Sequence, residues 1–188
     1  MTDAFVVDPA RSSLILRTRA RGLFAALGHD LEIHAAKVNG EASRDGAAWS
    51  GRLVVPVAGL EVVGVLRRGE LRRDVLSDGD RREIARKVRD EVFRGVEEVV
   101  VTARGTPEAP VVRVSIAGNE ADAQVTVEMR DEQRELHVHA AGGVSMRALG
   151  LREVKAPLGA FVVRDTVEIE ASLVVVPSPA APTGHGST

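Results

Sequence analysis

The sequence contains few of the residues that usually stabilise or activate a small β-protein. Cysteine is absent, which excludes disulfides, thiolate metal sites and cysteine nucleophiles. Tyrosine is absent as well, and one Trp and four Phe bring the aromatic content to only 3%. Because large rings supply much of the apolar area in protein interiors, an interior built by this chain must be filled by Val, Leu and Ile or be left partly open.

Long apolar runs and an excess of one charge are also lacking. No run approaches the roughly 18–20 residues that a helix needs to cross a bilayer, and residues 1–5 show neither the basic nor the apolar region of a signal peptide. We therefore expect a cytoplasmic protein, or a periplasmic one if a leader has been removed. A net charge of −2 over 188 residues gives no support to nucleic-acid binding, which needs a basic face.

What the chain does have is an alternation of apolar and polar residues, above all in its second half. Val125, Val127 and Met129 alternate with polar residues, and the same period of two recurs at 112–116 and 166–173. Side chains of a strand point to opposite faces in turn, so each segment has one apolar and one polar face. This pattern is typical of an antiparallel sheet that is covered on one side only.

One stretch of mixed charge breaks this alternation and has an apolar spacing of four instead. Ile84, Val88 and Val92 form a narrow stripe along one side of a helix. Asp80 and Glu83 fit a capping box at the start of that helix. The charges are of both signs, so the stretch predicts an amphipathic helix with a solvated face.

The pattern therefore predicts an all-β chain with one inserted helix, over about residues 78–95. One helix cannot cover about eight strands, whereas closure into an antiparallel barrel buries their apolar faces together and removes free edges. A sandwich satisfies the same pattern less economically. We expect one domain over residues 1–177 and a disordered tail over 178–188, which is rich in Pro, Ser and Gly.

Four stretches of the chain also follow one another in a recognisable order. They are a strand with Asp-Pro and serines at 5–13, a Gly-His-Asp segment at 28–33, a mixed-charge insertion at 75–95, and a closing stretch with glycines and Asp-x-Val at 150–167. Together they resemble the YceI-like family of lipocalin-like β-barrels. The resemblance implies an antiparallel barrel that encloses a long apolar ligand, a polyprenyl chain or another amphiphile, often in a homodimer.

We predict a non-catalytic binding protein that holds an isoprenoid, polyprenyl or fatty-acid-like molecule in its barrel and serves in its transport. Each methylene buried in such a lumen gains about 0.8 kcal/mol, so a long chain can bind tightly with one polar contact. The predicted ligand-binding residues are mainly apolar side chains of the inner face and of the loops at the barrel end: Leu16, Phe24, His29, Leu31, Ile33, Leu53, Val55, Val114, Val127, Val138, Phe161 and Ile169.

Two other functional hypotheses remain open. The barrel could lack a ligand and act as an interaction protein or homodimer, with the charged helix at 80–94 as its contact surface. An enzyme with a site around His29 is the less favoured hypothesis. His29 itself is either a polar contact for a ligand head group or a hydrogen-bonded residue that holds the loop at 22–28.

Signals for catalysis or metal binding are weak. His137 and His139 share one strand face, which suits a metal, and His34 is a candidate third ligand. All three are expected on the polar outer face, where solvent-exposed histidines are the simpler interpretation. Ser145 lacks the second glycine of a nucleophile elbow, and no phosphate-binding glycine loop or dinucleotide fingerprint occurs. We therefore predict no catalytic residue, no metal and no cofactor.

Overall fold

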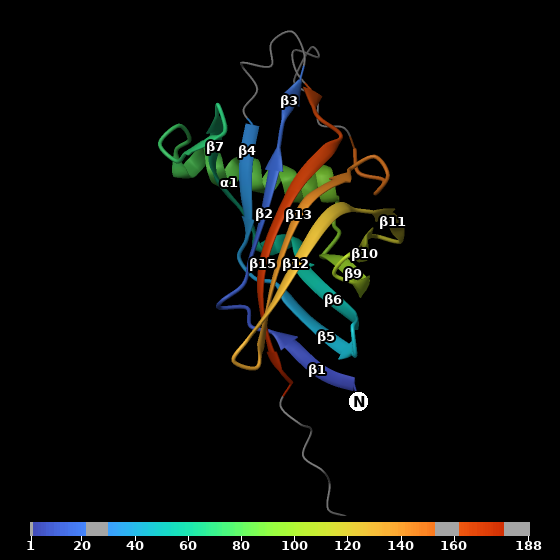
Figure 1. The fold of residues 1–188 in the computed structure, drawn as a ribbon. Helices are drawn as coiled ribbons and strands as arrows, with labels where there is room; N and C mark the ends of the chain where they lie inside the picture. Colours follow the sequence, from blue (N-terminus) through green and yellow to red (C-terminus); the bar gives the residue numbers. More distant parts are fainter. Residues whose placement is uncertain (1, 22–29, 153–161, 179–188) are drawn as a thin grey trace, which may run out of the picture.

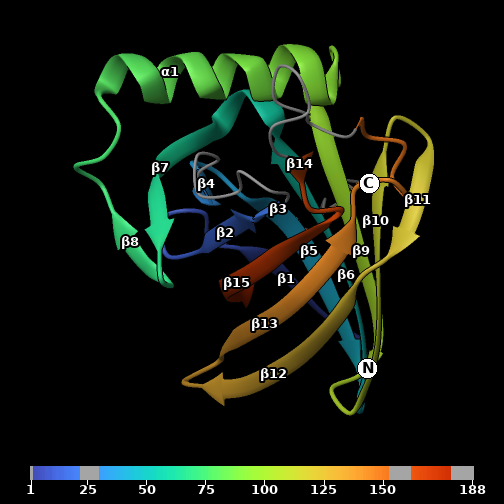
Figure 2. The same ribbon diagram turned by 90° about the horizontal axis from the view of Figure 1, so that it is seen from above.

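Most strands of this protein belong to one antiparallel sheet that curls around itself (Figures 1 and 2). The computed structural model describes residues 2–21, 30–152 and 162–178. In chain order the strands are β1 (Thr2–Val7), β2 (Ser13–Thr18), β3 (Ala20–Arg21), β4 (Asp30–Ala35), β5 (Asn39–Asp45), β6 (Ala48–Pro56), β7 (Leu60–Arg67), β8 (Glu70–Arg72), β9 (Glu98–Thr106), β10 (Ala109–Ile116), β11 (Asn119–Asp122), β12 (Gln124–Glu132), β13 (Glu135–Ser145), β14 (Val162–Val163) and β15 (Thr166–Pro177).

Neighbouring strands in the large sheet follow the order β11-β10-β9-β6-β5-β1-β15-β2-β4-β7-β8, and β13 joins β12 to β15. Strands β3 and β14 form a separate two-stranded ladder. Five ladders of the described sheet join strands that are consecutive in the chain, namely β5–β6, β7–β8, β9–β10, β10–β11 and β12–β13, and short turns connect them. A short 3-10 helix, η2 (Val57–Gly59), connects β6 to β7.

Strand β15 is the point at which the sheet branches. One of its edges pairs with β13 over Thr166–Val175. The other edge pairs with β2 through Glu168–Ser172 and then with β1 through Val175–Pro177. Strands β1 and β2 therefore follow one another along a single edge, and they lead into the two separate arms of the sheet.

The strands of the barrel wall form a closed ring, but the last step of the ring has no hydrogen-bonded ladder. It runs from β12 through β13, β15, β1, β5, β6 and β9 to β10, and β10 then lies against β12. No ladder joins β10 to β12, both of which the structure describes along their full length. The predicted all-β fold with an antiparallel barrel of about eight strands is confirmed, with this last contact made by packing.

One helical segment is inserted between β8 and β9, as predicted, and comprises α1 (Asp78–Lys87) and the π-helix η3 (Val88–Phe93). The N-cap is Ser77, whose Oγ accepts a hydrogen bond from the Asp80 backbone N–H at 3.1 Å. The Asp80 carboxylate accepts in return from the Ser77 N–H at 3.0 Å. The capping box therefore begins three residues before the predicted pair of Asp80 and Glu83, because Ser77 already has the extended backbone of an N-cap.

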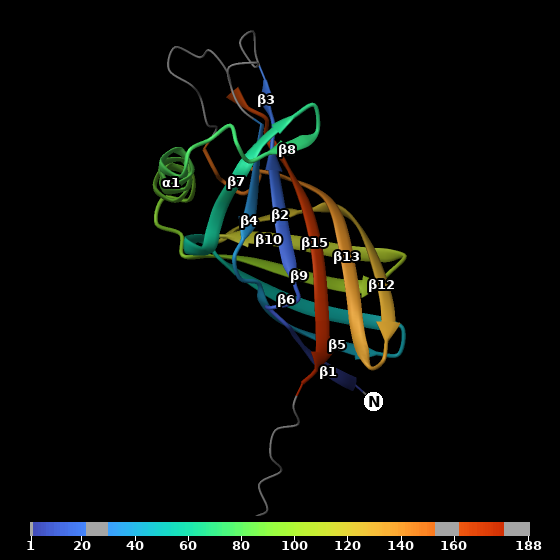
Figure 3. The same ribbon diagram turned by 90° about the vertical axis from the view of Figure 1, so that its left-hand side faces the viewer.

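The helix lies beside β7 and covers one side of the barrel (Figure 3). Ala85 is buried in the hydrophobic core, and Ile84, Val88 and Val92 pack against that core. Most charged residues of the helix are exposed, as the apolar spacing of four predicts, whereas Arg81 and Arg89 are half-buried. No helix in the described part of the chain is long and apolar enough to span a membrane.

Candidate binding lumen

The strand register assigns each side chain to the inside or the outside of the barrel. Ile169 of β15 lies opposite Leu16 of β2, and Leu16 lies opposite Ile33 of β4. Ile33 in turn faces Val62 of β7. Ile33 and Val62 are buried, and Leu16 and Ile169 pack against the same core. This row identifies the inner face, and alternation along each strand extends it to the rest of the wall.

Small side chains cover a large part of that inner face. Across β5, β6 and β9 the register aligns Ala42, Gly51 and Ala103. On β13 and β15, Ala140 lies opposite Ala171. Small residues contribute little volume to the space between the walls, and the buried core is made mainly of Val, Leu and Ile together with Phe5 and Phe93.

The predicted binding residues that the structure describes all point inward, but they differ in burial. Ile33, Val55 and Val114 are buried, with 5%, 3% and 4% of their surface exposed. Half-buried residues that pack against this core are Leu16, Leu31, Leu53, Val138 and Ile169, and Val127 is half-buried outside it. The predicted residues Phe24, His29 and Phe161 lie outside the described residues.

The inward apolar side chains are more exposed than side chains in a closely packed barrel would be. A side chain that faces the inside of a closely packed barrel has other side chains around it and loses nearly all of its accessible surface. Here apolar residues on several strands keep part of that surface although they face away from bulk solvent. This partial exposure of inward apolar side chains is the observation from which a lumen can be inferred.

Polar groups gather at one end of the inner face, near the first residues of β6. The guanidinium of Arg44 donates from Nη1 to both carboxylate oxygens of Asp131, at 3.0 Å each. It also lies 3.8 Å from the Asp3 carboxylate and 5.8 Å from the centre of the Phe5 ring. Because β5 and β12 are not neighbours in the sheet, the Arg44–Asp131 ion pair spans the end of the barrel.

Trp49 lies directly opposite Arg44 in the β5–β6 ladder. It has the same parity as Leu53 and Val55, so it faces inward. Its indole Nε1 is buried and has no hydrogen-bond partner among the described residues. The sequence interpretation did not single out Trp49, although strand parity alone was enough to place it on the inner face.

The outer face carries an ionic network in place of apolar residues. Glu32, which is only 5% exposed, accepts hydrogen bonds from Arg17 Nε at 2.9 Å and from His34 Nε2 at 2.8 Å. Arg17 reaches Glu170 on the next strand at 2.7 Å. Burial alone would raise the pKa of Glu32, but the hydrogen bonds from His34 and Arg17 outweigh it and hold that pKa below its ordinary value.

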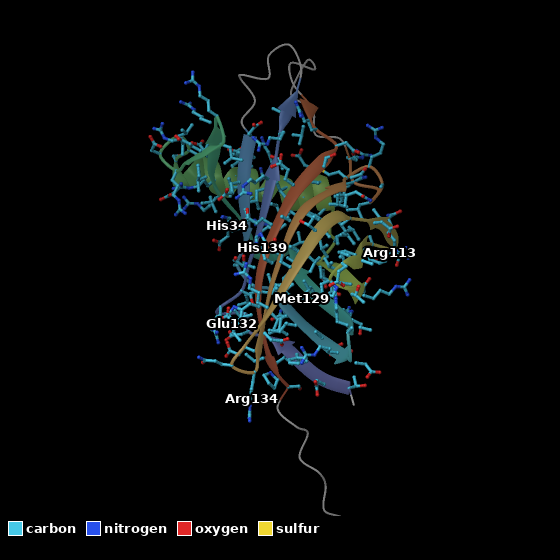
Figure 4. The ribbon with its side chains drawn as sticks, in the orientation of Figure 1. His34, Arg113, Met129, Glu132, Arg134 and His139 are labelled. Atoms are coloured by element: carbon cyan, nitrogen blue, oxygen red, sulfur yellow. The ribbon has the colours of Figure 1, made fainter. Side chains whose placement is uncertain are left out.

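The three histidines considered as metal ligands lie on the outer surface, as their parity predicted. Figure 4 shows His34 and His139 on the same side of the barrel. His139 lies 3.4 Å from the Ser172 hydroxyl, and His137 lies 3.8 Å from the carboxylates of Glu132 and Glu135. Among the described residues, no three His, Asp or Glu side chains are placed to hold a metal ion.

A groove of about 610 Å³ is found on the outer surface, across β1, β5, β6, β9 and β10. Its outward side chains include Arg52, Thr102, Arg104 and Val111. Val111 is 44% exposed, and neither Arg52 nor Arg104 forms an ion pair with any residue that the structure describes. Ala42, Gly51 and Ala103, which the register places on the inner face, also border this groove, so it lies directly against the wall of the barrel.

Solved structures of other proteins share the fold of this chain. No protein-family model matches this chain, and no curated protein matches it. Among solved structures, BcnA of Burkholderia cenocepacia superposes with a TM-score of 0.63 at 15% identity, covering 89% of this chain and 98% of that one. A polyisoprenoid binding domain from Saccharophagus degradans, implicated in plant cell wall breakdown, superposes with a TM-score of 0.61 at 12% identity, covering 94% and 99%. The chain therefore has the YceI-like β-barrel fold.

Proposed function

We propose that this protein binds a long apolar or amphipathic small molecule, of the isoprenoid, polyprenyl or fatty-acid type, in its barrel and catalyses no reaction on it. The observation that carries the proposal is the set of inward apolar side chains that remain half-exposed, among them Leu16, Leu31 and Leu53. A ligand chain would cover these side chains. An eight-stranded barrel is the size at which the interior is either just filled or holds one small ligand.

The binding free energy would come mainly from the hydrophobic effect. Each buried methylene contributes about 0.8 kcal/mol, so a long chain needs few polar contacts to bind. The described lining residues all come from strands of the large sheet, and Phe24, His29 and Phe161 complete the proposed site. One of the structural neighbours named above is a polyisoprenoid binding domain, which supports the same class of ligand for this chain.

The polar clusters of the described structure support binding rather than catalysis. The pKa of Glu32 is lowered, which keeps this carboxylate ionised and unsuited to act as a general acid near neutral pH. Ser145 donates to Asp165 at 2.6 Å and accepts from the Ala148 backbone N–H at 3.0 Å. Its hydroxyl therefore stabilises a turn. Among the described residues, no histidine contacts this hydroxyl to activate it as a nucleophile.

Extraction of the purified protein with organic solvent, followed by mass spectrometry, tests this proposal directly. We expect a stoichiometric long-chain compound, and native mass spectrometry should show the matching increase in mass. A second arm titrates delipidated protein with octadecan-2-one and octadecane. Absence of any retained compound, together with no binding of either probe, would contradict the proposal.

An interaction protein or homodimer is the second candidate, and the outer groove is the observation that favours it. Arg52 and Arg104 line the groove and could contact acidic groups of a partner. This surface differs from the charged helix that the sequence suggested. Small-angle scattering across a concentration series measures the oligomeric state, and a monomer at every concentration would remove the homodimer.

A further inference from the structure

The indole N–H of Trp49 is an unexplained donor on the inner face of the barrel. Its Nε1 atom is buried, and no acceptor lies within hydrogen-bond distance among the described residues. A buried donor without a partner costs roughly 1–3 kcal/mol, and native proteins rarely leave one unsatisfied. Because protein atoms cover Nε1, neighbouring side chains must move aside to admit an acceptor from a bound molecule, and such an acceptor would then remove this cost.

The position of Trp49 places such an acceptor at one end of the lumen. Trp49 is the second residue of β6, and the inward residues Gly51, Leu53 and Val55 follow it along the same strand. At about 3.3 Å per residue, the distance from Trp49 to Val55 is about 20 Å, which is the length scale of a long alkyl chain. A ligand with its polar end at Trp49 can therefore extend its chain along the apolar row.

The charges beside Trp49 restrict what kind of acceptor fits. Arg44, opposite Trp49 in the ladder, is already engaged by both oxygens of Asp131. Asp3 lies 3.8 Å from the same guanidinium. The group of one cation and two carboxylates is net negative, and it disfavours a further anion, such as a ligand carboxylate, at this end of the barrel.

We propose that Trp49 donates its indole N–H to an uncharged oxygen of the ligand, a carbonyl or a hydroxyl, and thereby fixes the ligand's polar end beside the Arg44–Asp131 ion pair. This inference rests on the proposed function, because it assigns the orientation and head-group class of the ligand in the same lumen. It selects ketones, esters, amides and alcohols of long chain over the corresponding carboxylates.

The single Trp of the chain makes this hydrogen bond directly observable. Protein labelled with ¹⁵N gives one indole resonance, which can be followed during titration with octadecan-2-one, octadecane or octadecanoate. We expect the ketone to move the indole proton downfield and the alkane to leave it close to its starting position. The ketone should bind about two- to tenfold more tightly than the alkane, which is the range for one net hydrogen bond.

Trp49→Phe removes the N–H and keeps an aromatic ring in place. Its affinity for octadecan-2-one should fall to the level of octadecane, and its affinity for octadecane should stay unchanged. Asp131→Asn is the complementary variant, because it frees the guanidinium of Arg44. Binding of octadecanoate should then improve by about two- to fivefold, the scale of an exposed ion pair. His139→Phe, on the outer surface, is the control and should change neither affinity.

The outcomes separate this inference from the proposed function. If ketone and alkane bind equally and the indole resonance does not move, lumen binding stands and the role of Trp49 is wrong; an ordered water then satisfies the N–H. If neither probe binds to the wild-type protein, the proposed function fails first. The resonance of the wild-type protein decides the question even where Trp49→Phe lowers stability.

Discussion

Filling the lumen with a side chain of the protein itself should prevent ligand binding while leaving the fold intact. Ala140 is the position to change, because it faces inward from β13 between Val127 of β12 and Ala171 of β15. It is half-buried and packs against the core. In Ala140→Phe the ring would project from this wall into the space that we assign to the ligand.

The expected loss of binding free energy depends on how many ligand methylenes the ring displaces. If the ring replaces roughly four ligand methylenes at about 0.8 kcal/mol each, binding weakens by about 3 kcal/mol, or roughly 200-fold. The free energy of unfolding of the unliganded protein should change by less than about 1 kcal/mol, because the ring contacts half-exposed walls. A tightly packed interior would instead be destabilised by about 1–3 kcal/mol.

Isothermal titration with octadecan-2-one and urea unfolding of the unliganded protein measure the two quantities. His139→Phe is the matched control, since it adds the same ring one residue earlier on the exposed face of β13, and it should alter neither. The reasoning is refuted if Ala140→Phe binds the probe as the wild type does. It is equally refuted if Ala140→Phe loses several kcal/mol of stability in the absence of ligand.

Three further predictions concern stability. Gly142→Ala should destabilise the protein by about 1–3 kcal/mol, because its Cβ would lie 1.9 Å from the Gln124 carbonyl oxygen. Gly51→Ala should be tolerated, since no atom lies nearer than 3.4 Å to its Cβ. Urea unfolding compares the two variants, and equal losses of stability would contradict the prediction. Ser77→Ala should cost about 1 kcal/mol through loss of the helix cap, measured in the same way, and no change would show that the cap is not needed. Glu32→Gln should cost about 2 kcal/mol at pH 7, less than a fully buried pair because Arg17 and His34 are partly exposed. Since the folded-state pKa of Glu32 lies below its ordinary value of 4.5, its contribution is complete above that pH and is lost as the pH falls through the lowered pKa. The difference in unfolding free energy between the two proteins should therefore shrink as the pH is lowered below 4.5, and a constant difference would contradict the assignment.

Strand parity accounts for most of what could be predicted. Val125, Val127 and Met129 alternate with polar residues, and in the structure the same alternation separates inside from outside. The period is a local property, so it survives whatever partners a strand has. The helix was predictable for the same reason, because the spacing of Ile84, Val88 and Val92 depends only on the helical repeat.

Features that depend on distance between strands were not predictable. The sequence contains two overlapping capping patterns, Ser77 with Asp80 and Asp80 with Glu83, and the path of the chain out of β8 decides between them. The burial of Glu32 has no local signal, because its alternation marks it as an outward polar residue. Its shielding comes partly from His34, two residues later on the same strand, and partly from Arg17, which only the pairing of β2 with β4 brings opposite Glu32.

The site was predictable in part. Leu16, Ile33 and Ile169 could be assigned to the inner face from alternation, and the structure places them in one row. Trp49 has the same parity as Leu53, yet the absence of an acceptor for its N–H is a matter of three-dimensional distances. The link between Arg44 and Asp131, 87 residues apart, has no counterpart in any local pattern.

The branching of β15 has a consequence for how the protein is made. This strand completes the ladders of β1, β2 and β13, although it is the last of the described strands to leave the ribosome. Until then the nascent chain carries unpaired edges and uncovered apolar faces, which favour aggregation and binding by chaperones. Synthesis of residues 166–177 therefore sets the earliest moment at which the barrel can close, and the ligand that we propose could be enclosed only after translation has passed that point.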